Sequence, residues 1–225
     1  MPVPVYSVYE QAILFIAALV VFTSFLMLGQ KRLSGMIHLF AAQGALLAAT
    51  TALAAYALPY PHLYVSALII VTLKVILIPA MLHRLIVRLD MHRDAEPLYL
   101  YGYVMMAAAA LVMFSYYVVE PIEHLSTLAT RNAMAVSLAV VLLGMLLMIT
   151  RRQVVTHVIG FMAIENGLFF AAVASTQGMP MVVELGIAFD VLVAAVIFGV
   201  FFFHIRSSID SLDVDRLNRL SEVEP

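Results

Sequence analysis

The sequence predicts an all-α membrane protein with seven transmembrane helices, its N-terminus outside and its C-terminus in the cytoplasm. Of its 225 residues 64% are apolar and only 12% are charged, whereas soluble domains have about 45–50% apolar and about 25% charged residues. Seven apolar runs are each near twenty residues long, the length that a helix needs to cross a bilayer. Lysine and arginine gather in alternate connections between these runs, and this alternation sets the direction of the chain.

The apolar runs are separated by turn-forming or charged residues. In chain order we expect helices over residues 6–28, 36–57, 62–83, 99–119, 132–149, 154–175 and 181–205. The first run lacks a basic start, so we expect a retained span and not a cleaved signal peptide. We divide the chain into a four-helix membrane region at 1–129, a three-helix membrane unit at 130–206 and a short cytoplasmic tail at 207–225.

The positive-inside rule gives the orientation. Basic residues that follow odd-numbered runs are Lys31, Arg32, Arg84, Arg88, Arg93, Arg151, Arg152, Arg206, Arg216 and Arg219. On the opposite side lies Arg131 alone, and Lys74 is inside a run. An odd number of spans makes this alternation possible, so the two arguments support each other. We therefore expect a multi-pass membrane protein.

Composition also limits the chemistry. Cysteine is absent, which removes disulfides, cysteine nucleophiles and thiolate-held iron–sulfur clusters. The net charge is −2 and no basic patch stands out, so nucleic-acid binding is not indicated. No phosphate loop, serine triad motif or zinc motif is found. We expect no active site and no cofactor in this chain, although His38 with His83 leaves a haem anchor as an alternative.

Five ionisable residues lie well inside the apolar runs: Lys74, His157, Glu165, Glu184 and Asp190. A charge at the centre of a bilayer costs about 2.5–3.5 kcal/mol on insertion scales, so such residues face protein or water and are functional candidates. Counting from the ends of the runs places Lys74 and Glu165 near the midplane, with Asp190 central or slightly outward. These three suggest a polar layer across the bundle.

Near these charged residues lie a proline, which removes a backbone hydrogen bond, and glycines, which allow close helix contact. Pro79 removes a backbone hydrogen bond about one residue from Lys74. Small residues that allow close helix contact are Gly160, Gly167 and Gly186. A lysine–carboxylate pair that only holds helices together remains the alternative to a functional role. Gln43 indicates helix packing.

The most specific sequence motif is Val158-Ile159-Gly160-Phe161-Met162-Ala163-Ile164-Glu165-Asn166-Gly167. It resembles the glutamate-asparagine-glycine helix of hydrogenase 4 component E, a membrane subunit of group 4 nickel–iron hydrogenase and formate hydrogenlyase complexes. The resemblance continues at residues 183–191, at 72–79 around Lys74 and in the tail at 211–217. It covers most of the chain in the same order.

The last three runs are similar to the small K subunit of complex I and to the C subunit of multisubunit cation/proton antiporters. Aligned on Gly160 and Gly167, the first glutamate of that subunit would fall at Met162, whereas the acid here is Glu165, one turn along on the same face. The second would fall near Glu184, with a spacing to Gly186 that differs by two residues. The transfer of a role is therefore firmer for Glu165.

The resemblance implies a non-catalytic membrane subunit of a group 4 hydrogenase-like, complex I-related redox complex in the cytoplasmic membrane of a bacterium or archaeon. Its partners would be large antiporter-like membrane subunits and a soluble redox module such as a nickel–iron hydrogenase. In proton translocation Glu165 and Asp190 would be carriers and Lys74 their modulator. His157 would be the cytoplasmic entry and Glu184 an outer member. The alternatives are a stand-alone proton-coupled cation transporter and a haem or quinone membrane anchor.

Overall fold

The computed structural model describes residues 8–57, 62–88, 101–121, 128–175, 186, 188–197 and 199. Every regular element in this part of the chain is helical. The helices are α1 (Val8–Gly29), α2 (Leu33–Ala57), α3 (His62–Ile70), η1 (Val71–Leu77), α4 (Ile78–Arg88), α5 (Tyr101–Val119), α6 (Leu128–Thr150) and α7 (Val154–Ser175). A shorter apolar helix follows at Ala188–Ile197.

Six of these helical segments are long and apolar enough to cross a membrane. They correspond to the first six expected spans, with α3, η1 and α4 joined as one segment at Leu63–Val87. The all-helical fold class and its membrane-spanning character are thus confirmed. Most of the expected seventh span, 181–205, lies outside the described residues, so the number of seven and the orientation of the termini stay predictions.

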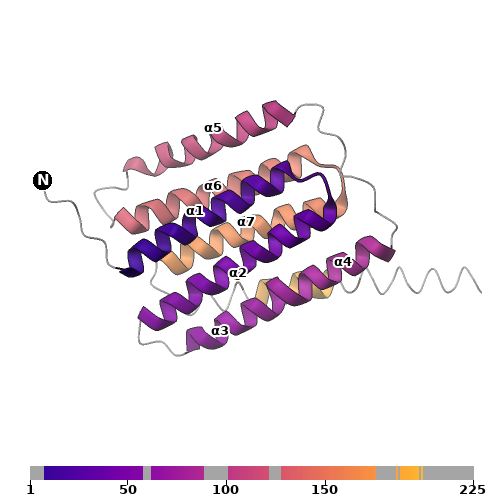
Figure 1. Ribbon diagram of the computed structural model, residues 1–225, viewed down its shortest axis with the longest axis horizontal. Helices are drawn as coiled ribbons and strands as arrows, with labels where there is room; N and C mark the ends of the chain where they lie inside the picture. Colours follow the sequence, from indigo (N-terminus) through magenta and orange to yellow (C-terminus); the bar gives the residue numbers. More distant parts are fainter. Residues whose placement is uncertain are drawn as a thin grey trace, which may run out of the picture.

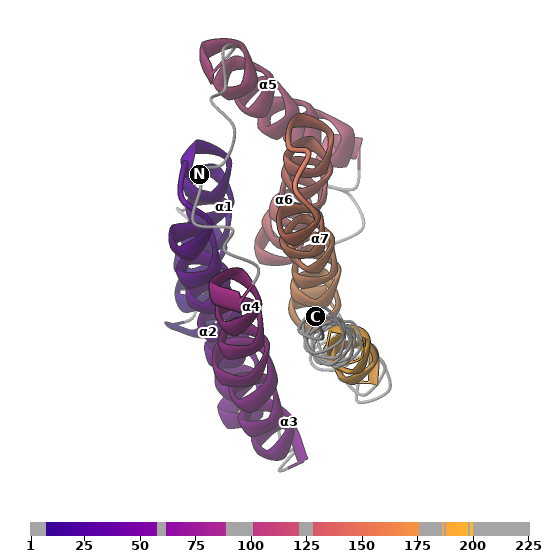
Figure 2. The same ribbon diagram turned by 90° about the vertical axis from the view of Figure 1, so that its right-hand side faces the viewer.

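The helices form two layers. In the end-on view of Figure 2, α1, α2 and the α3–α4 segment form one row, and α6, α7 and the helix Ala188–Ile197 form the other, with α5 beside the end of that row. Successive helices run back and forth along one direction (Figure 1). Contacts between α1 and α6 and between α2 and α7 join the two layers.

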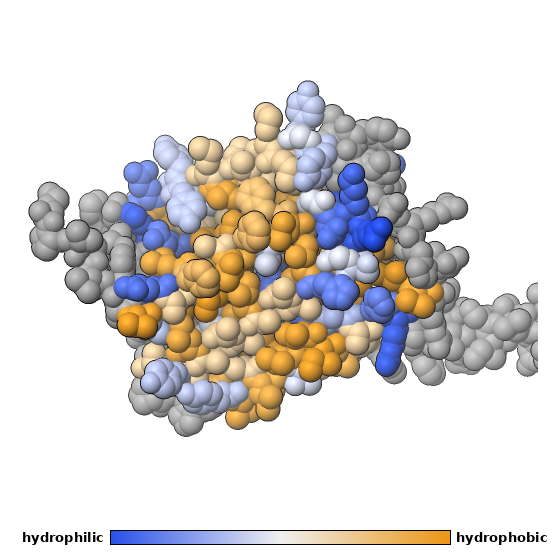
Figure 3. Space-filling view, in the orientation of Figure 1, coloured by the Kyte–Doolittle hydropathy of each residue, from blue (hydrophilic) through white to orange (hydrophobic). Residues whose placement is uncertain are grey.

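The surface matches a lipid environment. In Figure 3 apolar residues cover the middle of the visible face, and hydrophilic residues gather mainly toward the ends of the helices. Large apolar side chains stand on the outside, among them Phe15, Phe22, Met106 and Ile149. Such outward apolar surface is stable in a hydrocarbon layer but not in water.

Two glycines lie at a close contact between α6 and α7. A Cβ atom on Gly144 of α6 would lie 2.9 Å from the carbonyl oxygen of Gly160 on α7, and one on Gly160 would lie 3.1 Å from the carbonyl oxygen of Gly144. Any side chain larger than hydrogen would therefore push against backbone. In a membrane, where apolar burial does not drive helices together, this close approach is a main source of association.

Candidate functional site

A polar layer separates two apolar cores within the bundle. One core is built from Met27, Phe40, Leu82 and Ile159 with their neighbours. The other is built from Ala17, Leu47, Ile70 and Phe170 with theirs. On each of α1, α2, the α3–α4 segment and α7, a polar residue lies between the part that enters one core and the part that enters the other. These residues are Ser24, Gln43, Lys74, Glu165 and Asn166.

Lys74 is the centre of this layer, and its side chain is fully buried. Its Nζ donates a hydrogen bond to Glu165 Oε2 and another, of 2.7 Å, to Asn166 Oδ1. The same Nζ lies 3.3 Å from Asp190 Oδ1, an ion pair without hydrogen-bond alignment. An ammonium group has three hydrogens to donate, and the hydrogen bonds to Glu165 and Asn166 use two of them. The ring of Phe169 adds a cation–π contact at 5.5 Å.

A chain of hydrogen bonds that runs from α7 through α2 to α1 supports this arrangement. Asn166 Nδ2 donates to Gln43 Oε1 at 3.0 Å, and Gln43 Nε2 donates to Ser24 Oγ at 2.8 Å. Ser24 Oγ then donates to the carbonyl oxygen of Val20 at 2.9 Å. Because each amide uses its oxygen on one side and its nitrogen on the other, the orientation of every group is determined by Lys74. The chain links both layers of the bundle.

The charges of the layer do not balance when all three ionisable groups are charged. Lys74 supplies one positive charge, whereas Glu165 and Asp190 supply two negative charges. Glu165 Oε1 is buried and accepts no hydrogen bond from the described residues. Two carboxylates that lie beside one ammonium group compete for it as a counter-ion. The layer therefore holds one carboxylate more than its single cation can neutralise.

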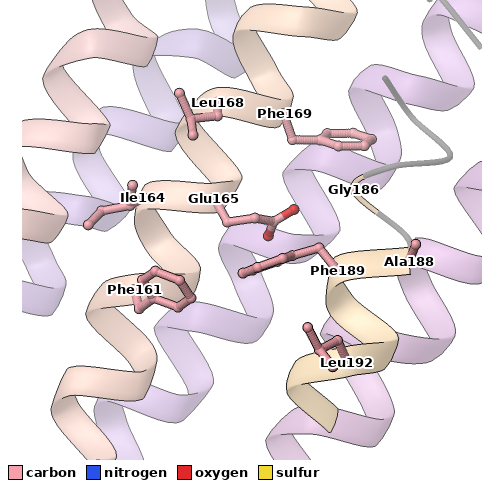
Figure 4. A pocket seen from close by; sticks show the side chains of 9 residues that line it. All are labelled: Phe161, Ile164, Glu165, Leu168, Phe169, Gly186, Ala188, Phe189 and Leu192. Atoms are coloured by element: carbon pink, nitrogen blue, oxygen red, sulfur yellow. The ribbon is translucent and has the colours of Figure 1, made fainter. Parts of the chain in front are cut away.

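A cavity of about 610 Å³ lies next to Glu165, between α7 and the helix Ala188–Ile197. Its lining is formed by Phe161, Ile164, Glu165, Leu168, Phe169, Gly186, Ala188, Phe189 and Leu192. Figure 4 shows the carboxyl group of Glu165 between the rings of Phe169 and Phe189. Glu165 thus lines the cavity and also pairs with Lys74 through Oε2.

Lys74 is carried by an irregular helix. The segment η1 (Val71–Leu77) is a π-helix, in which the backbone N–H of Ile78 donates to the carbonyl oxygen of Leu73, five residues back. Pro79 follows directly and has no N–H to donate, so the backbone there cannot continue a regular α-helical pattern. π-Helical turns inside α-helices are frequent at functional sites. Here the irregular segment lies opposite Gly44, where a Cβ would come within 2.9 Å of Lys74 Cβ.

The structure brings Lys74, Glu165 and Asp190 together but not His157. The His157 ring is half-buried at the start of α7, and its Nδ1 lies 2.9 Å from the carbonyl oxygen of Gln153. Among the described residues no hydrogen bond or ion pair joins it to the polar layer. Glu184 lies outside the described residues. His38 and His83 are both exposed, and His38 Nδ1 contacts the carbonyl oxygen of Ser34 at 2.7 Å.

The small residues singled out in the sequence lie at close contacts. Gly160 faces Gly144, and a Cβ on Gly167 would lie 3.0 Å from the carbonyl oxygen of Ser137. A Cβ on Gly186 would lie 2.8 Å from the ring of Phe169. These glycines let α6 approach α7 closely, and let the chain at 186 approach Phe169 of α7.

Sequence reasoning missed Asn166 and Ser24 as members of the layer, and it assigned Gln43 to helix packing. The signal was present: Gln43 is an amide in the middle of an apolar run, and Asn166 follows Glu165 directly. Such groups are expensive in hydrocarbon unless they have partners. What the sequence alone does not provide is the pairing, which joins positions 123 residues apart along the chain.

Comparison with known proteins finds relatives of this chain. The chain is 30% identical over 209 residues to the uncharacterized protein Rv0085 of Mycobacterium tuberculosis, a match that covers 92% of this chain and 95% of that protein. The chain belongs to the family of that mycobacterial protein. The alignment with Rv0085 spans nearly the whole chain, including the segments that carry the polar layer.

A second relative is hydrogenase-4 component E. The chain is 31% identical over 123 residues to this component from Escherichia coli K12 and from Shigella flexneri. The match covers 54% of this chain and 57% of the component's length, so the relationship is that of a distant membrane subunit. No family model matches the chain. No solved structure matches it either.

Proposed function

We propose that this chain is a non-catalytic membrane subunit of a group 4 hydrogenase-like, complex I-related redox complex, and that its polar layer takes part in proton translocation. Two findings support membership of such a complex: six helices of membrane-spanning length and the similarity to hydrogenase-4 component E. One observation carries the proton role. Lys74, fully buried in the bundle, lies between the carboxylates of Glu165 and Asp190.

In this proposal the position of the Lys74 ammonium decides which carboxylate is charged. When Nζ stays with Glu165, that group remains ionised and Asp190 is free to take up a proton. When Nζ moves toward Asp190, Glu165 loses its counter-ion and takes up the proton instead. Desolvation disfavours an unpaired charge in such a site, whereas a nearby cation favours it. A shift of about one hydrogen-bond length therefore exchanges the proton-binding site.

The π-helix supplies the freedom for such a shift. Its backbone hydrogen bonds are less regular than those of an α-helix, and Pro79 prevents complete regularisation. A conformational change in a neighbouring subunit that presses on this segment would move Lys74 relative to α7. Redox chemistry in a separate module would thereby be linked to proton binding without any cofactor in this chain.

Affinity purification of the tagged full-length chain from its native membrane in a mild detergent tests the membership. We expect antiporter-like subunits and a redox module to co-purify. Recovery of the chain alone as a stable, monodisperse protein, under conditions that keep known respiratory complexes intact, would contradict the proposal. That result would favour the stand-alone transporter.

A further inference from the structure

A groove of about 360 Å³ lies between α1, α2 and α5, where α1 ends and α5 begins. Its lining changes along the helices. Gln30 and Tyr101 line it at the level of the helix ends, whereas Phe25 of α1 and Met105 of α5 line it about 6–7 Å further toward the middle of the bundle. Tyr101 and Leu26 are 45% and 41% exposed, so the groove opens on the outer surface. The groove is thus polar at its outer end and apolar further in, which is the order of groups in a phospholipid.

Tyr101 stands at the polar end of this groove. Its hydroxyl oxygen would lie 3.0 Å from a Cβ placed on Gly29, so the ring reaches across from α5 to the last residue of α1. Tyrosine rings are enriched at the level of the lipid headgroups, with the apolar body in the hydrocarbon and the hydroxyl toward water. Tyr101 therefore places a hydrogen-bond donor where a headgroup would lie.

Exposed basic residues continue from the same end. Lys31 and Arg32 follow Gln30 directly, and both are exposed. Arg151 donates to the carbonyl oxygens at the end of α1, which brings the exposed Arg152 to this end as well. Hydrophilic residues are visible at this end of the bundle in Figure 3.

The carboxylates of the described residues lie elsewhere. Glu10 is in the first turn of α1 and Glu120 directly follows α5, so both are at the opposite end of the bundle. Glu165 and Asp190 belong to the polar layer in the middle. Within the described part of the chain, the exposed basic residues beside the groove therefore face no carboxylate, and their charge is complementary to an anionic headgroup.

We propose that this groove binds an anionic phospholipid. The phosphate lies beside Lys31, Arg32 and the Tyr101 hydroxyl, and one acyl chain runs along Phe25 and Met105 toward the middle of the bundle. A free phosphate would leave the apolar part of the groove unused, so the ligand is the whole lipid. This inference stands on the groove and the charges around it. It does not depend on the proposed function, and its test involves no proton transport.

The chain contains no tryptophan, so a single introduced tryptophan reports on one site. Phe25→Trp places the fluorophore in the groove, and Phe15→Trp places a control on α1 outside the groove, at a residue that is 67% exposed. The full-length proteins are reconstituted in lipid nanodiscs that contain a small fraction of a lipid brominated on its acyl chains. Bromine quenches a tryptophan that it contacts. Comparison of brominated phosphatidylglycerol with brominated phosphatidylcholine, at equal fraction, gives the preference of each site for the anionic lipid.

We expect Phe25→Trp to be quenched more strongly by the anionic lipid and Phe15→Trp to be quenched equally by both lipids. Adding Lys31→Gln or Arg32→Gln should each lower the relative association constant for phosphatidylglycerol about fivefold, and the double variant should remove the preference. Arg84→Gln is the matched control, since it removes an exposed basic residue from α4, which does not line the groove. It should leave the preference unchanged.

Leu39→Phe is a second variant that keeps the basic residues. It narrows the groove from the α2 side, so it should reduce quenching of Phe25→Trp by the brominated chain. Equal quenching of Phe25→Trp by the two lipids would overturn the proposal, as would an unchanged preference in the Lys31→Gln/Arg32→Gln variant. Loss of the preference in excess inorganic phosphate, but not in sodium chloride of equal ionic strength, would also overturn it by assigning the basic residues to a free anion.

Discussion

At the scale of single residues, one buried lysine requires several partners for its charge and its N–H donors. Lys74 is fully buried, donates hydrogen bonds to Glu165 and Asn166, and forms an ion pair with Asp190. Burial of a charge without such partners is prohibitive in an apolar environment. The lysine and its partners therefore stabilise the fold only as a set, and removal of one member leaves the others in an unfavourable state.

Replacement of Lys74 by Met is expected to lower stability by about 3–5 kcal/mol, since it leaves buried carboxylates without a counter-ion. In the double variant Lys74→Met/Glu165→Gln, part of that loss should return, because one of the carboxylates is gone. We expect a coupling of about 0.5–3 kcal/mol in a double-mutant cycle, measured by unfolding in detergent. Lys31→Met, at an exposed lysine, is the control. Strict additivity of the two single effects would contradict the observed contact.

The amide chain behind Lys74 makes a separate prediction. Asn166→Leu removes the acceptor for Lys74 and the donor to Gln43 together, so it should cost about 1–3 kcal/mol for each buried group left unpaired. Gln43→Leu should destabilise by a smaller amount. The double variant should be less harmful than the sum, because it removes both partners of one hydrogen bond. Thermal unfolding in detergent measures all three stability losses. A loss in the double variant that exceeds the sum of the two single losses would contradict the hydrogen bond between Asn166 and Gln43.

At the scale of elements, the bundle is fitted around an irregular helix. The π-helical segment projects Lys74 toward α7, and α2 can pack against this segment because Gly44 has no side chain. The two apolar cores on either side are ordinary helix contacts. The irregular segment is therefore the place where the structure departs from a simple bundle, and it is also where the charges meet.

Gly44→Ala tests this fit. The new methyl group would lie 2.9 Å from Lys74 Cβ, so α2 must move away from η1, and we expect a loss of about 1–3 kcal/mol from overpacking. Gly102→Ala in α5 is the matched control, since a Cβ there meets nothing within 4 Å. It should be neutral or stabilise the helix by up to about 1 kcal/mol. Equal unfolding midpoints for the two variants would show that the close approach at Gly44 is absent.

The end of α1 illustrates another local solution. Arg151 is buried, and its Nη2 donates to the carbonyl oxygens of Leu28 and Gln30 at 3.1 and 2.8 Å. These carbonyls lie at a helix C-terminus, where they lack intrahelical partners and attract a cation. Arg151→Met should therefore destabilise the bundle by about 1.5–3 kcal/mol. Arg152→Met, at the exposed neighbouring arginine, should have little effect on the same unfolding measurement.

At the scale of the whole molecule, hydropathy alone predicts most of the fold. Six expected spans correspond to helices within a few residues, because span length and turn residues are local properties. Lys74, Glu165 and Asp190 can also be found from the sequence, because a charged residue within an apolar run is costly in hydrocarbon and therefore stands out. Pairing across the bundle is a property of tertiary packing. The roles of Gln43, Asn166 and the π-helix therefore became visible only in three dimensions.

The most direct test of the central claim is redox-driven proton translocation by the intact complex in sealed membrane vesicles. Glu165→Gln should abolish or strongly reduce proton movement per electron while electron transfer continues, because the shared proton site is lost. Glu120→Gln, at an exposed glutamate directly after α5, should match the unmodified complex. A normal ratio of protons to electrons in Glu165→Gln, with the subunit present in stoichiometric amount, would contradict the assignment of this polar layer to proton translocation.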